Sequence, residues 1–312
     1  MAVLNERRAR MGLASLGLPS DVDVGANVRS VGAVETWERL LADESGSLAA
    51  RRARAVDLDE VEGEIAYVGA RFVIPDDPEW PAALDVLADH ELDGIRNVPY
   101  GLWLYGLGLD PQRPVAITGA RAATAYGTSI AEGLAADLAE AGSTVVTSLS
   151  FGIDVAAIQG AVAVEGMVPV VLLAGGLMCM RLSGHEHLVA ELDQRATVMT
   201  EHAPSIVPSR SNFLARSRLL AALSEGTVVV EAAVRSGART TAAWSRELGK
   251  PVMAMPGPIT SCQSRMPHSL IRDHGAHLVE EARDVAAVLA RAHSSDQEDP
   301  FGFAEPIERT HP

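Results

Sequence analysis

The sequence predicts an α/β protein built around a doubly wound, mainly parallel sheet, with a small helical domain before it. Two observations carry this prediction. From Pro114 to about Leu289, apolar runs alternate with Gly-containing turns and with segments of helical periodicity. Most of the apolar runs are almost continuous, which is typical of strands buried on both faces. Helical crossovers between such strands produce a parallel sheet.

Six apolar runs are the candidate strands. They comprise residues 114–118, 143–148, 168–175, 196–201, 227–232 and 251–257. Segments with helical spacing of apolar residues lie between them, at 128–142, 154–166, 185–196, 217–226 and 240–250. This order, with Gly-containing turns at the strand ends, predicts a Rossmann-like fold.

The chain is predicted to divide into two domains and a tail. Residues 1–66 contain short amphipathic helical patterns, such as 34–44 and 47–62, and no strand pattern. Residues 70–292 begin with a short apolar strand and hold the sheet. The polar, Pro-containing segment 293–312 is too short for another domain, so we expect it to be disordered.

The composition is that of an ordinary soluble protein. Of 312 residues, 47% are hydrophobic, which is enough for a full core. No run approaches the roughly 20 apolar residues of a membrane span, and the first residues lack the apolar region of a secretory signal. We therefore expect no membrane partner and a cytoplasmic location. Cys179 and Cys262 lie far apart, without disulfide or metal-binding spacing.

The net charge of -15 argues, by itself, against binding a polyanion such as nucleic acid. Electrostatic fields are local, however, because cellular salt screens charges over about 8–10 Å. A small basic pocket can therefore work on an acidic protein. The basic residues are nearly all arginine, which grips phosphate with two N–H groups and stacks on bases; Lys250 is the only lysine.

The turns after the strands are the places to look for a ligand, because helix N-termini and free N–H groups favour anions there. In the first turn, residues 117–127, Gly119 permits close backbone approach and Arg121 supplies charge; Gly127 closes the turn. The second turn contains Gly152 and leads into a helix with Asp154 in its first turn, where a carboxylate can also act only as a cap.

Two later segments add basic and hydroxyl groups. Residues 210–218 combine Arg210, Phe213, Arg216 and Arg218, and single strands are bound by such mixtures, since cations follow the backbone while a ring stacks on a base. Phe213 is equally compatible with a place in the core. The last segment follows the strand at 227–232; its candidate anion-binding residues are Ser236, Gly237 and Arg239.

No catalytic, metal or cofactor site is predicted. The first turn lacks both the G-x-G-x-x-G spacing of a dinucleotide site and the lysine of an ATP-binding loop. His185 and His187 could suggest a metal pair, but no third ligand stands at a suitable spacing. The sequence contains no Gly-x-Ser-x-Gly nucleophile motif. Binding without covalent chemistry is therefore the expected activity.

Taken in order, the turns and strands resemble the DprA (DNA-processing protein A, Smf) family. The segments that carry the resemblance are 74–84, 114–127, 142–162, 213–257 and 269–276. The first of them, IPDDPEWPAAL, is similar to the family's Asp-Pro-x-Tyr-Pro block, with Trp80 in the Tyr position. The resemblance spans Ile74 to Ala276.

The resemblance implies a homodimer that binds single-stranded DNA and helps to load a RecA-type recombinase during DNA uptake and recombination. The family's basic pocket corresponds here to Arg121, Phe213, Arg216 and Arg218, with Arg210 near the place of another basic residue. Two alternatives stay open. One is a nucleotide sensor or phosphoribohydrolase of the LOG group, of whose motif only Pro256-Gly257-Pro258 remains. The other is an interaction protein that has lost the ligand.

Overall fold

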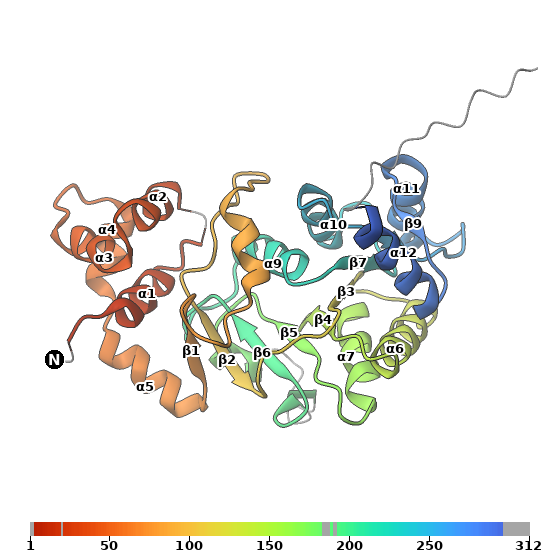
Figure 1. Ribbon diagram of the computed structural model, residues 1–312, viewed down its shortest axis with the longest axis horizontal. Coiled ribbons are helices and arrows are strands. Elements are labelled where there is room, and N and C mark those ends of the chain that lie inside the picture. Colours follow the sequence, from red (N-terminus) through yellow and green to blue (C-terminus); the bar gives the residue numbers. More distant parts are fainter. Residues whose placement is uncertain (1–2, 20, 183–187, 190–191, 296–312) are drawn as a thin grey trace, which may run out of the picture.

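A nine-stranded sheet runs through the centre of the described part of the chain (Figure 1). The computed structural model describes residues 3–19, 21–182, 188–189 and 192–295. The strands, in sheet order, are β1 (Arg71–Val73), β2 (Leu102–Gly106), β6 (Thr197–Thr200), β5 (Val170–Leu172), β4 (Val145–Ser148), β3 (Val115–Thr118), β7 (Gly226–Val229), β8 (Val252–Ala254) and β9 (His277–Leu278). All neighbours from β6 to β9 are parallel, and β1 and β2 pair antiparallel at one edge. The predicted fold class is confirmed.

The direction of winding reverses between β3 and β7. From β3 the chain proceeds through β4 and β5 to β6 on one side, whereas β7, β8 and β9 add to the other side. All six predicted strands occur within their predicted ranges or one residue outside them. Strands β2 and β9 were not predicted. In an open sheet of this kind the ligand site is expected at the carboxyl ends of the strands where the order reverses.

Helices cover both faces of the sheet. Side chains alternate along each strand, so that in β3 Val115 and Ile117 pack with α6 (Ala125–Glu140), α7 (Ile153–Ala163) and α12 (Ala282–Ser295). On the opposite face, Ala116 packs in the same cluster as buried side chains of α9 (Arg210–Ala222) and α10 (Ala238–Glu247). Helix α11 (Arg265–His274) packs beside β8. The strands are therefore buried on both faces, as their continuous apolar runs predicted.

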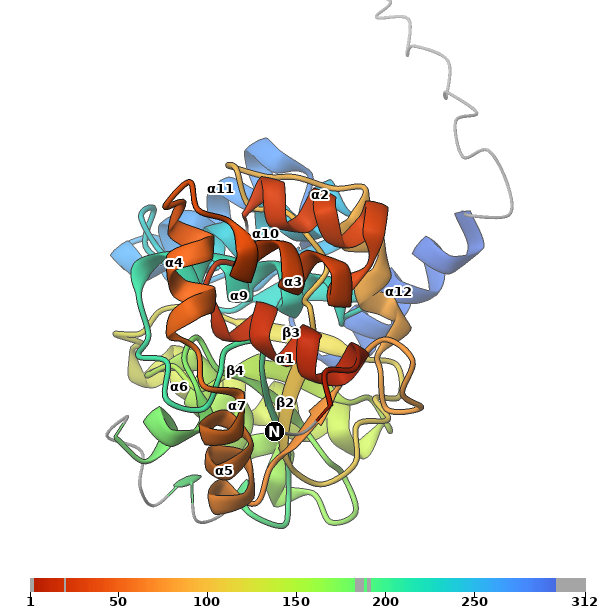
Figure 2. The ribbon, with the colours of Figure 1, turned by 90° about the vertical axis from the view of Figure 1, so that its left-hand side faces the viewer.

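In the described residues, five helices precede the sheet. They are α1 (Glu6–Ser15), α2 (Val22–Val31), α3 (Ala33–Ala42), α4 (Leu48–Ala55) and α5 (Leu58–Val68). The helical pattern at 47–62 forms two helices, because the Asp57 side chain accepts hydrogen bonds from the N–H groups of Asp59 and Glu60 and thereby begins a new helix. Figure 2 shows this helical region in front of the sheet.

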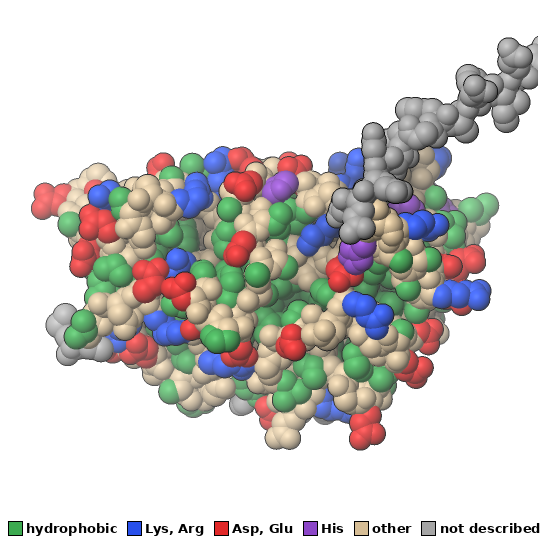
Figure 3. Space-filling model, in the orientation of Figure 1, with side chains coloured by type: hydrophobic (Ala, Val, Ile, Leu, Met, Phe, Trp, Pro, Cys, Tyr) green, Lys and Arg blue, Asp and Glu red, His purple; other side chains and the backbone are tan. Residues whose placement is uncertain are grey.

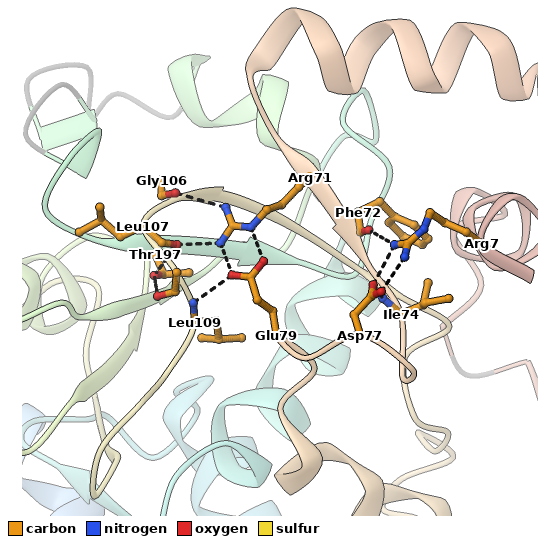
Figure 4. Close-up of polar contacts among 11 residues, drawn as sticks. Arg7, Arg71, Phe72, Ile74, Asp77, Glu79, Gly106, Leu107, Leu109 and Thr197 are labelled. Atoms are coloured by element: carbon orange, nitrogen blue, oxygen red, sulfur yellow. Dashed lines mark hydrogen bonds and ion pairs between the residues drawn. The ribbon is translucent and has the colours of Figure 1, made fainter.

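The helical region shares its core with the sheet. Buried side chains of α1, α3 and α4 form one continuous cluster with Phe72 of β1, Trp103 of β2 and Ile158 of α7. At the edge of this contact, both Arg7 guanidinium Nη atoms bind the Asp77 carboxylate at 2.6 and 2.8 Å, and Nη1 also donates to the Phe72 carbonyl (Figure 4). The division at residues 66–70 stays a prediction, since no break in packing marks it.

Lys250 and helix α12 lie on the part of the sheet domain away from the helical region (Figure 1). Lys250 donates hydrogen bonds from Nζ to the carbonyls of Ala221 and Ala222, at the C-terminus of α9. Helix α12 continues to Ser295, so the first three residues of the predicted tail are helical, and 296–312 lie outside the described residues. No helix in the described part of the chain is long and apolar enough to cross a membrane.

Candidate nucleic-acid interface

The loops that follow β3 and β7 meet where the strand order reverses. The N–H of Ala120 donates to the carbonyl of Glu231 at 2.6 Å, and the N–H of Ile153 donates to the carbonyl of Ala120 at 3.1 Å. Gly119 lies between these contacts, where an added Cβ would come within 2.6 Å of the Glu231 carbonyl. The three loops after β3, β4 and β7 are therefore packed directly on one another.

A cleft of about 910 Å³ opens above these loops. Its walls come from the segments 118–122, 208–217 and 233–241, together with Ser150, Asp154 and Gln263. Five arginines line it: Arg121, Arg210, Arg216, Arg235 and Arg239. Among the described residues none of the five forms an ion pair. We call this hollow the arginine cleft.

Positive charge is concentrated in the arginine cleft, although the protein as a whole is acidic. On the face shown in Figure 3, by contrast, acidic and basic side chains are interspersed. Five positive charges here face one carboxylate, that of the buried Asp154. Because charges on other faces are screened over about 8–10 Å, the local excess decides what binds. The net charge of -15 therefore does not oppose an anionic ligand at this site.

Phe213 organises two of the arginines. The Arg121 guanidinium lies over its ring, with Cζ 4.4 Å from the ring centre, and the Arg216 Cζ lies 5.3 Å from the same centre. Cation–π contact of this kind holds guanidinium planes against the ring. The arrangement offers a ligand flat cationic surfaces, which stack on bases and also donate to phosphate oxygens.

Arg216 and Asp154 face one another through a small polar network. The Arg216 Nη1 donates to the Ser150 hydroxyl at 3.4 Å, and Ser150 lies 3.3 Å from the Ser148 hydroxyl, which donates to Asp154. The Thr118 hydroxyl donates to the other carboxylate oxygen at 3.2 Å. Nε of Arg216 is buried and has no hydrogen-bond partner among the described residues.

Burial changes the acidity of both groups. It raises the pKa of Asp154 to about 6, although Arg216, the two hydroxyls and the Gly119 N–H all stabilise the charged carboxylate. Burial lowers the pKa of Arg216 to about 10, with the Arg121 charge acting in the same direction and Asp154 against it. At neutral pH the guanidinium is therefore charged, and the carboxylate is mostly charged.

An apolar cavity of about 360 Å³ adjoins the arginine cleft. It shares Arg121, Ser150, Phe213 and Arg216 with the cleft, and also Pro208. The rest of its wall is mainly hydrophobic and comes from the segments 149–151, 173–180 and 207–208. A flat apolar group attached to an anion would place the anion at the arginines and its apolar part in this cavity.

Glu231 holds the loop after β3 in place through hydrogen bonds to Thr124. Its carboxylate accepts hydrogen bonds from the N–H of Thr124 at 2.9 Å and from the Thr124 hydroxyl at 2.7 Å. Gly127 makes room for it, because a Cβ there would lie 2.2 Å from the carboxylate. Gly127 is buried and does not line the cleft. Its contact with the ligand stays a prediction; the structure shows that Gly127 lets the Glu231 carboxylate approach.

Gly152 also acts behind the cleft. Its φ of 77° lies in the left-handed region, and an added Cβ would meet the Ala120 carbonyl at 2.2 Å. It lies outside the cleft wall, although its neighbour Phe151 lines the apolar cavity. In the structure Gly152 allows two loops to pack together, and its direct role in binding stays a prediction.

Arg218, predicted to bind the nucleic acid, lies in the protein core. The side chain is fully buried, and its guanidinium forms a two-pronged ion pair with Glu201, each N–O distance being 2.6 Å. It also donates to the carbonyls of Asn97 and Ala215. Burial raises the pKa of Glu201, but the Arg218 charge and hydrogen bonds outweigh it and hold the pKa below its usual range. Arg218 is thus a core residue that lies outside the wall of the arginine cleft.

The remaining predicted residues lie together. Those on the wall of the arginine cleft are Gly119, Arg121, Arg210, Phe213, Arg216, Ser236, Gly237 and Arg239. Their role in binding stays a prediction. Sequence reasoning missed Arg235, which stands next to Ser236 in the same turn and could have been included on that ground. His185 and His187 lie outside the described residues, and the described residues contain no metal-binding cluster.

Comparison with known proteins agrees with this architecture. Residues 71–290 match the family model of DNA recombination-mediator protein A. The chain belongs to the DprA family. A DprA protein of Mycobacterium tuberculosis is 40% identical over 290 residues, which cover 89% of this chain and 74% of the relative. The resemblance predicted from the motifs is confirmed, and the phosphoribohydrolase alternative is not favoured.

Solved structures of the family have the same fold. The structure of DprA from Streptococcus pneumoniae superposes with a TM-score of 0.73 at 25% identity, covering 92% of this chain and 98% of that one. A structure of DprA from Helicobacter pylori, described for its single-stranded DNA binding mode, gives a TM-score of 0.59 at 22% identity. It covers 71% of this chain and 96% of that one.

Proposed function

We propose that the arginine cleft and the adjoining apolar cavity bind single-stranded DNA without covalent chemistry. One observation carries the proposal: five arginines without ion-pair partners among the described residues converge on one cleft beside an apolar cavity. Arginines that follow the backbone and surfaces that stack bases are the two components of single-strand sites. The DprA of Helicobacter pylori, which binds single-stranded DNA, supports the same function.

The apolar cavity is the reason to favour a single strand over a duplex. In a duplex the bases are stacked and paired, so only the phosphates and base edges are available. A single strand can turn a base away from its neighbours and into the cavity while its phosphates stay at Arg121 and Arg216. Arg121, Phe213 and Arg216 form a cation–π stack between the arginine cleft and the apolar cavity. There the arginines can bind the phosphate of a nucleotide whose base enters the cavity.

We propose in addition that the bound strand is passed to a RecA-type recombinase and that two copies of the chain pair through the sheet domain. Membership of the recombination-mediator family supports both points. Pairing would place two arginine clefts in one particle.

Fluorescence polarisation with labelled oligo-dT, a duplex of equal length and AMP tests the proposed activity. We expect the single strand to bind better than the duplex, and AMP to bind weakly because it offers one phosphate. The Arg121→Ala variant should bind all oligonucleotide sequences less tightly. Nuclease, ATPase or nucleotide glycosidase activity that follows the protein through purification would contradict binding without chemistry.

Two further measurements test the partners. Light scattering at micromolar concentration should give twice the mass of one chain; a single-chain mass at every concentration would exclude the dimer. Recombinase filament formation on DNA coated with single-strand-binding protein should be faster with the parent than with Arg121→Ala. Equal rates would show that the cleft plays no part in recombinase loading.

A further inference from the structure

A third hollow continues the binding surface onto the helical region. It is a groove of about 390 Å³ between α1, α4 and the segment that joins β6 to α9. Its wall consists of residues 15–17, Arg52, Val56, 206–207, Ser209 and Asn212. Figure 2 shows the β6–α9 segment running beside the helical region. Ile206 is 3.8 Å from the position of a Cβ on Gly17, so the two parts are in contact.

The groove is continuous with the site already described. Val207 lines both the groove and the apolar cavity, and Ser209 lines both the groove and the arginine cleft. The three hollows therefore meet around residues 206–209. Val207 forms the lip between them and is 73% exposed. A chain that leaves the arginine cleft at Ser209 enters the groove directly.

Arg52 supplies a cation inside the groove. Its Nη1 donates to the carbonyls of Leu16 at 2.6 Å and Gly17 at 3.3 Å, just after the C-terminus of α1. These bonds hold the guanidinium in place by one of its nitrogens, and the side chain is exposed. Among the described residues Arg52 forms no ion pair. Its other N–H groups can thus donate to an anion, as a guanidinium does to phosphate.

We infer that single-stranded DNA continues from the arginine cleft over residues 206–209 into this groove, where Arg52 neutralises a further phosphate. The inference rests on the proposed function, because it extends the same strand. It assigns the helical region a direct part in binding. Contact with Arg52 increases the number of nucleotides that the protein covers. Only oligonucleotides long enough to reach the groove should therefore gain affinity from Arg52.

A length series of oligo-dT, from about 4 to 16 nucleotides, tests this. Arg52→Ala should bind the shortest oligonucleotides as the parent does and lose affinity beyond a threshold length. Above that length the slope of log K against log salt should be smaller by about 0.7, the share of one phosphate on a single strand. Arg52→Lys, which keeps the charge, should restore most of that slope.

Arg54→Ala is the matched control. It removes the same charge from the same helix, but Arg54 donates to the Asp43 carbonyl and does not line the groove. It should behave as the parent at every length. Equal slopes for parent and Arg52→Ala at all lengths would overturn the inference. A loss shared by short and long oligonucleotides, with a lower Tm, would show a structural role and also overturn it.

The two proposals fail in different ways. If the parent binds no oligo-dT of any length, the proposed function fails. If the parent binds and Arg121→Ala weakens binding at every length while Arg52→Ala has no length-dependent effect, only the extension onto the helical region fails.

Discussion

Two arginines of α9, two residues apart, should respond to truncation in opposite ways. Arg216 lines the arginine cleft beside Phe213, whereas Arg218 is fully buried against Glu201. Arg216→Ala should therefore weaken DNA binding and destabilise the fold less than Arg218→Ala does. Arg218→Ala should do the reverse, because it leaves the Glu201 carboxylate buried without its counter-ion.

The size of the binding effect follows from the charges in the cleft. If each of the five arginines neutralises one phosphate, the slope of log K against log salt is about -3.5, or about a 130-fold loss of affinity between about 50 and 200 mM salt. With four arginines the slope falls to about -2.8 and the loss to about 50-fold. Arg216→Ala should show the second pair of values. Fluorescence polarisation across a salt series measures the slope directly.

Arg218→Ala should change the free energy of unfolding by more than Arg216→Ala changes the free energy of binding. Removing one partner of a buried ion pair destabilises a protein by about 3–5 kcal/mol, a large share of the roughly 5–15 kcal/mol that holds a domain folded. Arg218→Ala should lower the midpoint of urea unfolding accordingly. If it does not fold, the double variant Arg218→Met with Glu201→Leu should recover the fold, since both charges are gone, and bind DNA with the parent's slope.

Either of two results would refute the assignment of Arg216 to the cleft and of Arg218 to the core. An unchanged salt slope in folded Arg216→Ala would mean that the residue does not meet phosphate. A reduced slope in the folded Arg218/Glu201 double variant would mean that the buried pair influences the cleft.

Four further outcomes are expected. Phe213→Ala should weaken single-strand binding by about 1–3 kcal/mol with a nearly unchanged salt slope, because stacking is lost and no cation is removed; a large change in slope would contradict this. Since the pKa of Asp154 is raised to about 6, affinity should rise as pH falls through 6 and the carboxylate is neutralised; Asp154→Asn should bind more tightly at pH 7.5 and lose this component, and an identical pH profile would refute it. For the same reason Asp154 stabilises the fold below its unfolded pKa of about 3.9, and this contribution is lost as pH rises through 6. Gly152→Ala should lower Tm and weaken binding together, because the Ala120 carbonyl must move; a parent-like Tm would refute the packing role.

Much of this architecture could be predicted from the sequence because its signals are local. Runs such as 227–232 are apolar throughout, and the turns after them must gather at one edge of a parallel sheet. That rule alone placed Arg121, Arg210 and Arg239 on one cleft. It did not find β2, whose five residues, Leu102–Gly106, follow Gly101 and pair with β6, far away in the sequence.

The different locations of Arg216 and Arg218 follow from where helix α9 begins. The sequence predicted a helix from Ser217, but α9 begins at Arg210, with the Ser209 side chain as its N-cap. Residues three apart share a helix face, so Arg210, Phe213 and Arg216 point one way and Arg218 another. The serine before Arg210 was the signal for this register. The partner of Arg218, Glu201, is a tertiary contact that no local pattern shows.

Because Lys250 is the only lysine, lysine acetylation could change the charge of only one side chain. Acetylation removes charge from lysine and leaves the guanidinium of arginine untouched. Every cation on the wall of the arginine cleft is an arginine, and Lys250 sits at the far end of α9, with its amine on the Ala221 and Ala222 carbonyls. Burial lowers the pKa of that amine to about 8, so at neutral pH more of it is uncharged than in an exposed lysine. An acyl group there would release the end of α9 and leave the charge that faces the ligand intact.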